Sequence, residues 1–239
     1  MKKIILPLLL GLFLAAAASH FSPAPIHEAP ASAPGHVPRE TKYIALTFDD
    51  GPHPIYTDRI VDVLERNGAR GTFFVLGSRI AEHLPQLHHI LASGSMIANH
   101  TWDHLDLTTL SADRLQRQIG SVFGSIRSLC GSDPWLVRPP YGFADESVCK
   151  NCPYPIICWS IDTLDWAWLD AARVSEHILT HAADGDIILM HDIYPSTAEA
   201  VEAVVPQLQA RGFQLVTVAE LLHIKGITPE AGHLYYHAK

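Results

Sequence analysis

The segment YIALTFDDGP at residues 43–52 consists of an apolar run, two adjacent aspartates and a Gly-Pro pair. An apolar run bounded by Gly-Pro is typical of a buried strand, which predicts a strand that ends at Asp49 and Asp50. Successive strand side chains point to opposite faces, and the end of a strand relaxes this rule, so the two carboxylates can take different roles at one site. Asp before Gly-Pro is also ordinary turn chemistry, and this segment alone leaves that structural role open.

Strand-like and helical segments alternate along the rest of the chain. The strand-like runs are 43–48, 71–76, 135–138, 156–161, 186–190 and 213–217, and the helical stretches are 57–67, 79–93, 111–129, 170–183 and 196–211. This alternation favours a parallel α/β fold, in which reactive residues collect at the carboxyl ends of the strands. Residues 42–239 are enough for one well-buried domain.

His100 and His104, in the segment NHTWDH at 99–104, are four residues apart. In a helical turn this spacing places both imidazoles on one face, where they can converge on one metal ion. With one carboxylate they would form a two-His, one-Asp site with open positions, in which zinc lowers the pKa of a water and polarises a carbonyl. The chain has 15 histidines, so a pair at this spacing also arises without a metal.

His191 lies in the segment LMHD at 189–192, at the end of an apolar run that predicts a buried strand. A histidine in that position suits a general acid that protonates a leaving amine, because nearby carboxylates can tune its pKa. A structural histidine that caps the strand is the alternative.

Arg138, in the segment RPPYG at 138–142, has a planar guanidinium suited to pairing with a carboxylate. Tyr141 stands beside a glycine, where a backbone N–H can meet a developing oxyanion. Asp165 and Trp166, in DTLDW at 162–166, can supply a carboxylate that orients a histidine and an apolar wall. Taken singly, each of these residues has an ordinary structural interpretation as an ion pair, a turn or a packed Trp.

Taken in their order along the chain and with their separations, the five segments resemble the NodB-homology polysaccharide deacetylases, carbohydrate esterase family 4. The resemblance covers roughly residues 42–222 and implies the distorted, incomplete (β/α) barrel of that family. Carried over by position, the resemblance implies that Asp49 is the catalytic base, held by Arg138, and that His191 is the catalytic acid, tuned by Asp165. It also implies that the backbone N–H of Tyr141 stabilises the oxyanion and that Trp166 and Leu189 line the substrate pocket. The implied metal ligands are Asp50, His100 and His104.

The activity implied by this resemblance is metal-dependent hydrolysis of N-acetyl groups on an N-acetylglucosamine polysaccharide, such as peptidoglycan, a chitin-like polymer or poly-N-acetylglucosamine, with release of acetate. The implied cofactor is one divalent ion, with Zn2+ as the default and Co2+, Ni2+ or Mn2+ as alternatives. An O-deacetylase of the acetylxylan esterase type and a non-catalytic glycan-binding protein are the other hypotheses. A non-catalytic relative is expected to lack Asp49 or His191, and this chain has both.

The N-terminal segment predicts an exported protein. Lys2 and Lys3 precede an apolar run and four alanines, which is typical of a signal peptide over residues 1–18. The run is shorter than the roughly 20 apolar residues of a spanning helix, so no stable membrane insertion is expected. Residues 19–41 are rich in Pro and Ala and predict a linker, followed by a catalytic domain at 42–239. The predicted location is the periplasm, the cell envelope or the medium.

The charge of the chain disfavours polyanionic partners. Removal of residues 1–18 leaves 15 basic against 25 acidic residues, a formal charge of −10. That balance argues against nucleic acid and anionic membrane surfaces, and it is compatible with a neutral acetylated glycan as the substrate. The protein is expected to be a monomer.

Four cysteines, Cys130, Cys149, Cys152 and Cys158, lie within thirty residues of one another. An even count in an oxidising compartment predicts two disulfides with three possible connectivities. Half of a zinc knuckle and free thiols are the alternatives.

Overall fold

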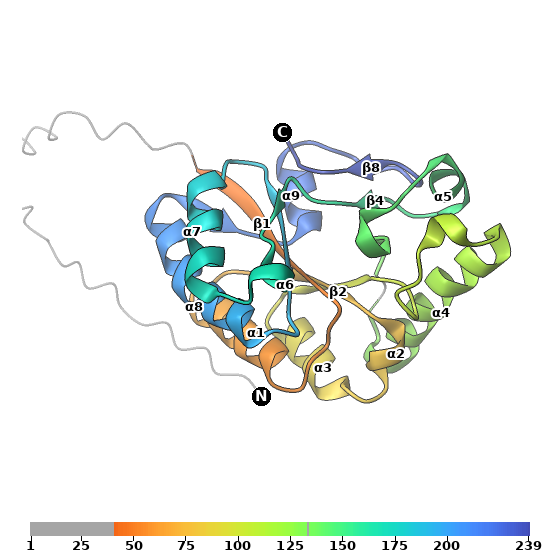
Figure 1. Cartoon of the computed structure of the whole chain (residues 1–239), viewed down its shortest axis with the longest axis horizontal. Coiled ribbons are helices and arrows are strands. Elements are labelled where there is room, and N and C mark those ends of the chain that lie inside the picture. Colours follow the sequence, from red (N-terminus) through yellow and green to blue (C-terminus); the bar gives the residue numbers. More distant parts are fainter. Residues whose placement is uncertain (1–40, 133) are drawn as a thin grey trace, which may run out of the picture. The chain divides into compact units, whose positions relative to one another are not determined.

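Strand β1 (Lys42–Asp49) is the central strand of the computed structural model, which describes residues 41–132 and 134–239 (Figure 1). From Ala45 to Asp49 it pairs in parallel with β6, and β2 lies along its other edge. Its last six residues are buried, as expected for a parallel strand with both faces covered. The predicted signal peptide (1–18) and linker (19–41), apart from Thr41, lie outside the described residues.

The remaining elements follow in the order α1 (Tyr56–Arg66), β2 (Gly71–Val75), α2 (Gly77–Ile80), α3 (Leu84–Ala92), β3 (Met96–Asn99), α4 (Ala112–Cys130), α5 (Glu146–Asn151), β4 (Ile156–Ile157), β5 (Ile161–Asp162), α6 (Asp165–Trp168), α7 (Ala171–His181), β6 (Ile187–His191), α8 (Pro195–Ala210), β7 (Phe213–Leu215), α9 (Val218–Ile224) and β8 (Leu234–Tyr235). Short 3-10 turns lie at Leu107–Thr109 and Pro140–Gly142.

The strands form an incomplete barrel. The main sheet has the order β3-β2-β1-β6-β5, and β7 pairs with the start of β1. Single bridges from Val137 to Asn99 and to Ile156 join this sheet to the pair β4-β8. The helices surround the strands, with α1, α7 and α8 on one side and α2, α3 and α4 on another (Figure 1). The predicted parallel α/β architecture is therefore confirmed.

The two-residue period of the strands divides the core into an outer and an inner layer. On β1, Ile44, Leu46 and Phe48 pack in the large cluster under the helices. Ala45 packs in a second cluster with strand residues from around the barrel, such as Phe74 and Ala98. Thr47 and Asp49 share the face of Ala45, so the pleat directs Asp49 to the interior of the barrel.

The element predictions are confirmed for most segments and wrong for three. The runs that became β1, β2, β6 and β7, and the helices α1, α4, α7 and α8, lie where the sequence places them. The predicted strand at 135–138 is wrong: only Val137 forms bridges, and two prolines without an N–H follow Arg138. The predicted strand at 156–161 is divided into β4 and β5, with residues 158–160 outside both. The predicted helix at 79–93 is divided into α2 and α3, because a new helix begins at Leu84 with Pro85 in its first turn.

The predicted disulfides are also absent, because all four cysteines are free thiols. Cys130 packs against the large core cluster, whereas Cys149 and Cys152 pack in a separate cluster near α5. Burial raises the pKa of Cys152 and of Cys158 to about 11, which disfavours the thiolate that disulfide exchange requires. Among the described residues, no helix has the length and apolar character to cross a membrane.

The loop that follows β3 is anchored on the N-terminus of α2. The N–H groups of Gly77 and Ser78 donate to the carbonyls of Thr101 and Trp102, at 2.9 and 3.1 Å. Trp102 lies so close to Gly77 that a Cβ there would be 2.3 Å from Trp102 Cε3 and 2.8 Å from Val122 Cγ2. Gly77 is therefore required by close packing.

We expect Gly77→Ala to lower the free energy of unfolding by about 1–3 kcal/mol, because the added methyl displaces Trp102. Gly120→Ala is the matched control: Gly120 lies within α4 with nothing within 4 Å of the place that an added methyl would take, and the change should stabilise by roughly 0.5–1 kcal/mol. Urea denaturation measures both. A Gly77→Ala protein as stable as the parent would contradict this packing.

Candidate active site

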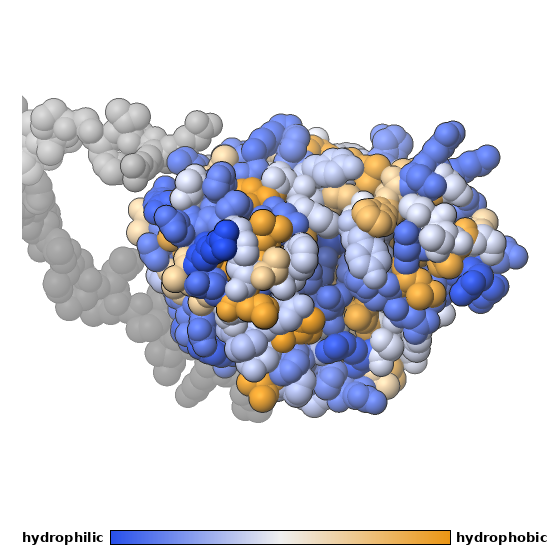
Figure 2. Space-filling model, in the orientation of Figure 1, coloured by the Kyte–Doolittle hydropathy of each residue, from blue (hydrophilic) through white to orange (hydrophobic). Residues whose placement is uncertain are grey.

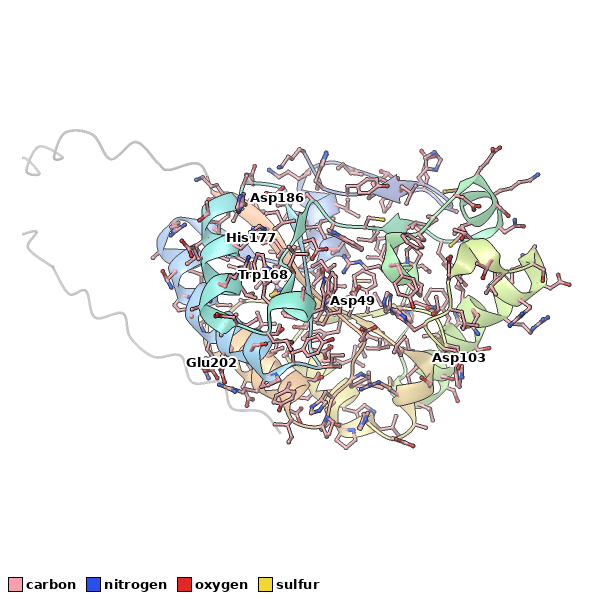
Figure 3. The ribbon with its side chains drawn as sticks, in the orientation of Figure 1. Asp49, Asp103, Trp168, His177, Asp186 and Glu202 are labelled. Atoms are coloured by element: carbon pink, nitrogen blue, oxygen red, sulfur yellow. The ribbon has the colours of Figure 1, made fainter. Side chains whose placement is uncertain are left out.

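The carboxyl ends of the strands bring the predicted site residues together. Asp49 and His191 are register partners on the neighbouring strands β1 and β6. Asn99 ends β3 and is bridged to Val137, so His100 and Arg138 follow side by side. Asp49 lies near the middle of the described part of the chain in Figure 3, inside the ring of secondary structure. The arrangement matches the expectation that reactive residues collect at this edge of a parallel sheet.

Asp50, His100 and His104 form a triad suited to one metal ion. Asp50 Oδ1 lies 3.5 Å from His100 Nε2 and 3.4 Å from His104 Nε2. One ligand atom from each residue lies within 4.8 Å of the others. Two imidazoles and one carboxylate with an open side form a donor set that divalent transition metals accept.

The local backbone of this triad differs from the prediction. His100 and His104 do not share a helical turn, because residues 100–106 form an irregular loop in which Thr101 and His104 have φ values of 69° and 56°. Gln118 of α4 holds the loop, since its Oε1 accepts from the N–H groups of Trp102 and Asp103 at 3.0 Å. The helical explanation of the spacing is wrong, and the convergence of the two rings is confirmed.

The protonation and the hydrogen bonds of the triad are compatible with a bound cation. His100 Nδ1 lies 2.8 Å from the Arg138 carbonyl, so this nitrogen donates and Nε2 keeps its lone pair toward Asp50. Burial lowers the pKa of His100 to about 3, so the ring is neutral. Asp50 Oδ1 is buried and has no hydrogen-bond partner among the described residues. An orphaned carboxylate oxygen between two imidazoles is chemically suited to a divalent ion.

Asp49 is fixed by the buried Arg138. Arg138 Nη1 donates to Asp49 Oδ1 and to Thr47 Oγ1, both at 2.8 Å. Arg138 is fully buried and Asp49 nearly so. Burial raises the pKa of Asp49, and the Arg138 guanidinium opposes that rise. Asp49 Oδ2 lies 3.7 Å from His100 Nε2, so this carboxylate has one oxygen tied and one facing the triad.

His191 is paired with the fully buried Asp165. His191 Nδ1 lies 2.8 Å from Asp165 Oδ1, and the His191 backbone N–H donates to Oδ2 at 2.7 Å. Thr197 Oγ1 also donates to Oδ2, at 2.6 Å. Burial alone would lower the pKa of His191, but the hydrogen bond and charge of Asp165 outweigh it and raise that pKa to about 9. The ring is therefore a protonated imidazolium at neutral pH.

A pocket of about 370 Å³ connects these groups. It is lined by Asp49, Asp50, His100, His104, Tyr141, Phe143, Trp159, Asp162, Trp166, Leu189, His191 and Tyr194. The side chains of Tyr141, Phe143 and Trp166 are about half exposed and form its aromatic rim, whereas Leu189 is buried in its wall. Tyr141 has a φ of 62°, which turns the backbone sharply at the pocket edge.

Sequence reasoning missed several lining and supporting residues. Phe143 and Tyr194 line the pocket, and Thr47 and Thr197 support Arg138 and Asp165. Tyr194 follows His191 by three residues, and Thr47 is two residues before Asp49 on the same strand face, so proximity to the motifs was the available signal.

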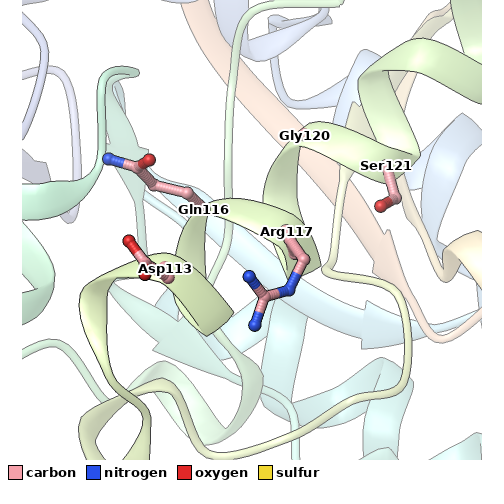
Figure 4. Close-up of a pocket in the computed structure, with 5 residues that line it drawn as sticks. All are labelled: Asp113, Gln116, Arg117, Gly120 and Ser121. Atoms are coloured by element: carbon pink, nitrogen blue, oxygen red, sulfur yellow. The ribbon is translucent and has the colours of Figure 1, made fainter.

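A second hollow lies on the outer face of α4 and is lined by Asp113, Gln116, Arg117, Gly120 and Ser121 (Figure 4). It contains none of the predicted site residues. On the face drawn in Figure 2, hydrophobic residues lie scattered among hydrophilic ones.

Comparison with known proteins agrees with this geometry. Residues 36–154 match the family model described as polysaccharide deacetylase. A peptidoglycan-N-acetylglucosamine deacetylase of Bacillus cereus is 35% identical over 199 residues, which cover 79% of this chain and 92% of that protein. The chain belongs to the polysaccharide deacetylase family. The predicted NodB-homology relationship is thereby confirmed.

Two further similarities support the fold of this family member. The peptidoglycan-N-acetylglucosamine deacetylase PgdA of Listeria monocytogenes is 38% identical over 183 residues, 77% of this chain and 39% of that protein, so the chain spans about two fifths of the length of such relatives. The structure of the peptidoglycan deacetylase PdaC from Bacillus subtilis superposes with a TM-score of 0.76 at 38% identity, over 78% of this chain and 93% of that one. The incomplete barrel expected from the sequence is confirmed.

The His191 environment predicts a histidine that stays charged well above neutral pH. In chelator-treated protein, we expect NMR titration of the His191 ring to give a pKa near 9, and Asp165→Asn to lower it, because an amide carries no charge to hold the imidazolium. Since the folded pKa lies above that of the unfolded chain, the stabilisation is complete below about pH 6.5 and is lost as the pH rises to about 9.

The control for this titration is Asp170→Asn, which changes an exposed aspartate at the start of α7. It should leave the His191 titration unchanged. An unshifted His191 pKa in Asp165→Asn would show that other groups hold the proton.

Proposed function

We propose that the domain at 42–239 is a metal-dependent deacetylase that hydrolyses N-acetyl groups of an N-acetylglucosamine polysaccharide and releases acetate. The observation that carries the proposal is the pair of opposed proton carriers in one pocket, Asp49 tied to Arg138 and His191 tied to Asp165. One is a carboxylate that can accept a proton, and the other is an imidazolium that can donate one.

Asp50, His100 and His104 would hold the metal, with Zn2+ as the default and Co2+, Ni2+ or Mn2+ as alternatives. When bound, the ion would polarise the acetamide carbonyl and lower the pKa of a water. The neutral His100 ring and the orphaned Asp50 oxygen support this assignment.

The residues of the chain account for the two proton transfers. Asp49 Oδ2 is the oxygen free to take a proton from the attacking water while Oδ1 stays bound to Arg138. As the acyl C–N bond breaks, His191 Nε2 gives its proton to the departing amine, and Asp165 keeps the ring aligned through Nδ1. The Tyr141 backbone N–H, at the sharp turn on the pocket edge, would stabilise the oxyanion.

The pocket wall is suited to bind a sugar that carries an acetyl group. Leu189 offers a buried apolar surface for the acetyl methyl, and the half-exposed Trp166 offers a ring face for a pyranose. The similarity to peptidoglycan deacetylases favours a cell-wall glycan as the substrate of this chain, and the predicted signal peptide favours action in the envelope or outside the cell.

Acetate release tests this proposal and its alternatives. Purified residues 19–239 are offered N-acetylglucosamine oligomers, peptidoglycan and acetylated xylan, before and after chelation and addition of zinc. Metal-dependent release from the aminosugars is the expected result. Release only from xylan would favour an O-deacetylase, and no release from metal-loaded protein would favour a glycan-binding role.

Two variants separate the roles of the adjacent aspartates and the triad. Asp49→Asn should keep the metal and lose a factor of roughly 10² to 10⁴ in turnover, because the base is gone and the ligands remain. His104→Ala should lose metal occupancy as well as turnover. Turnover and bound zinc are measured on the same samples. Equal zinc loss in both variants would mean that the roles of Asp49 and Asp50 are reversed.

A further inference from the structure

Asp50 has a backbone conformation that a non-glycine residue rarely adopts. Its φ is 72°, in the left-handed region, and such a conformation persists only where the surrounding structure fixes it. In this conformation the Asp50 carboxylate lies toward His100 and His104. The carboxylate of the neighbouring Asp49 lies instead against Arg138. The contacts that hold residues 50–53 therefore decide where the carboxylate lies.

Asp192, the residue after β6, packs against this segment. It directly follows His191, it is 1% exposed, and its carboxyl packs against Gly51 so closely that a Cβ there would lie 2.3 Å from both Oδ atoms. Asp192 Oδ2 accepts a hydrogen bond from Thr57 Oγ1. Its Oδ1 has no hydrogen-bond partner among the described residues. A buried carboxyl with so little compensation is costly to keep and needs another reason to be there.

Thr57 continues the connection to the loop. It is fully buried in the first turn of α1, and its Oγ1 accepts from the His53 backbone N–H at 2.7 Å while it donates to Asp192. On the opposite side, the Gly51 carbonyl accepts from the Leu76 N–H at 3.0 Å. The segment after Asp50 is thus held by β6 and α1 on one side and by the end of β2 on the other.

We propose that Asp192 and Thr57 are positioning residues that clamp the segment 51–53 and so hold Asp50 in its metal-binding orientation. The inference rests on the proposed function for the identity of the metal ligands. Because Asp192 follows His191 directly, the clamp also fixes the distance between the strand end that carries the acid and the loop that carries the metal ligand. Residues that orient metal ligands typically change affinity by 10- to 100-fold when removed.

Thr57→Val tests the hydrogen bonds of the clamp without changing the shape of the side chain. We expect it to weaken zinc binding 10- to 100-fold in competition with a chromophoric chelator, and Thr57→Ser to retain near-normal affinity because it keeps the hydroxyl. Thr72→Val is the matched control. Thr72 is also a fully buried threonine whose Oγ1 accepts a backbone N–H, from Val218, but it lies at the start of β2, away from the carboxyl ends of the strands.

Asp192→Ala and Asp192→Asn test the carboxyl itself. Asp192→Ala removes both the contact with Gly51 and the acceptor for Thr57, and it should weaken zinc binding at least as much as Thr57→Val. Asp192→Asn keeps shape and acceptor and should rescue most of the affinity. Asp186→Ala, at the opposite end of β6, controls for the loss of a buried aspartate.

Zinc affinities within twofold of the parent in Thr57→Val and Asp192→Ala, at a stability loss equal to that of the controls, would overturn the inference. A crystal structure of Thr57→Val in which Asp50 keeps its left-handed φ and faces His104 would overturn it independently of any metal measurement. Absence of saturable zinc binding in the parent protein would instead overturn the proposed metal site.

Discussion

The buried guanidinium of Arg138 is the contact on which the rest of the site depends. It donates hydrogen bonds to Asp49 on β1 and to the carbonyls of Ile157 and Cys158, in and next to β4. The guanidinium carbon, Cζ, lies 4.1 Å from the centre of the Phe74 ring on β2. One side chain therefore joins three parts of the barrel wall that are far apart in sequence. A buried charge of this kind is tolerated only when its donors find partners, so the barrel interior and the Asp49 carboxylate are fixed together.

Backbone strain is concentrated at the same end of the barrel. Six described non-glycine residues have a left-handed φ, and five of them belong to the site or to its loops: Asp50, Thr101, His104, Tyr141 and Leu164. Each turns the chain sharply after a strand end or beside the pocket. The inward alternation of β1 and β6 places Asp49 and His191 without a left-handed φ, whereas Asp50, His104 and Tyr141 need loop conformations that neighbouring contacts must hold.

The contrast between residues on regular strands and residues on left-handed loops explains how much of the site could be predicted from the sequence. The buried runs of β1 and β6 and the order of the five motifs sufficed for the parallel fold and for the convergence of Asp49, His191 and Arg138. The path of the loop from His100 to His104 was not predictable, because its left-handed residues carry no glycine signal and its anchor, Gln118, lies on a helix further along the chain. The roles assigned to the site residues remain predictions that the variants above address.

The buried His100 and the partly buried His191 show how the group behind an imidazole sets its protonation state. His100 Nδ1 donates its hydrogen bond to a neutral carbonyl, so burial dominates, its pKa falls to about 3 and Nε2 keeps a lone pair. His191 Nδ1 donates its hydrogen bond to a carboxylate, so the negative charge outweighs burial, its pKa rises to about 9 and Nε2 also carries a proton. The difference between a backbone carbonyl and a carboxylate behind the ring thus separates an imidazole with a free lone pair from one with a proton on Nε2, within a pocket that both rings line.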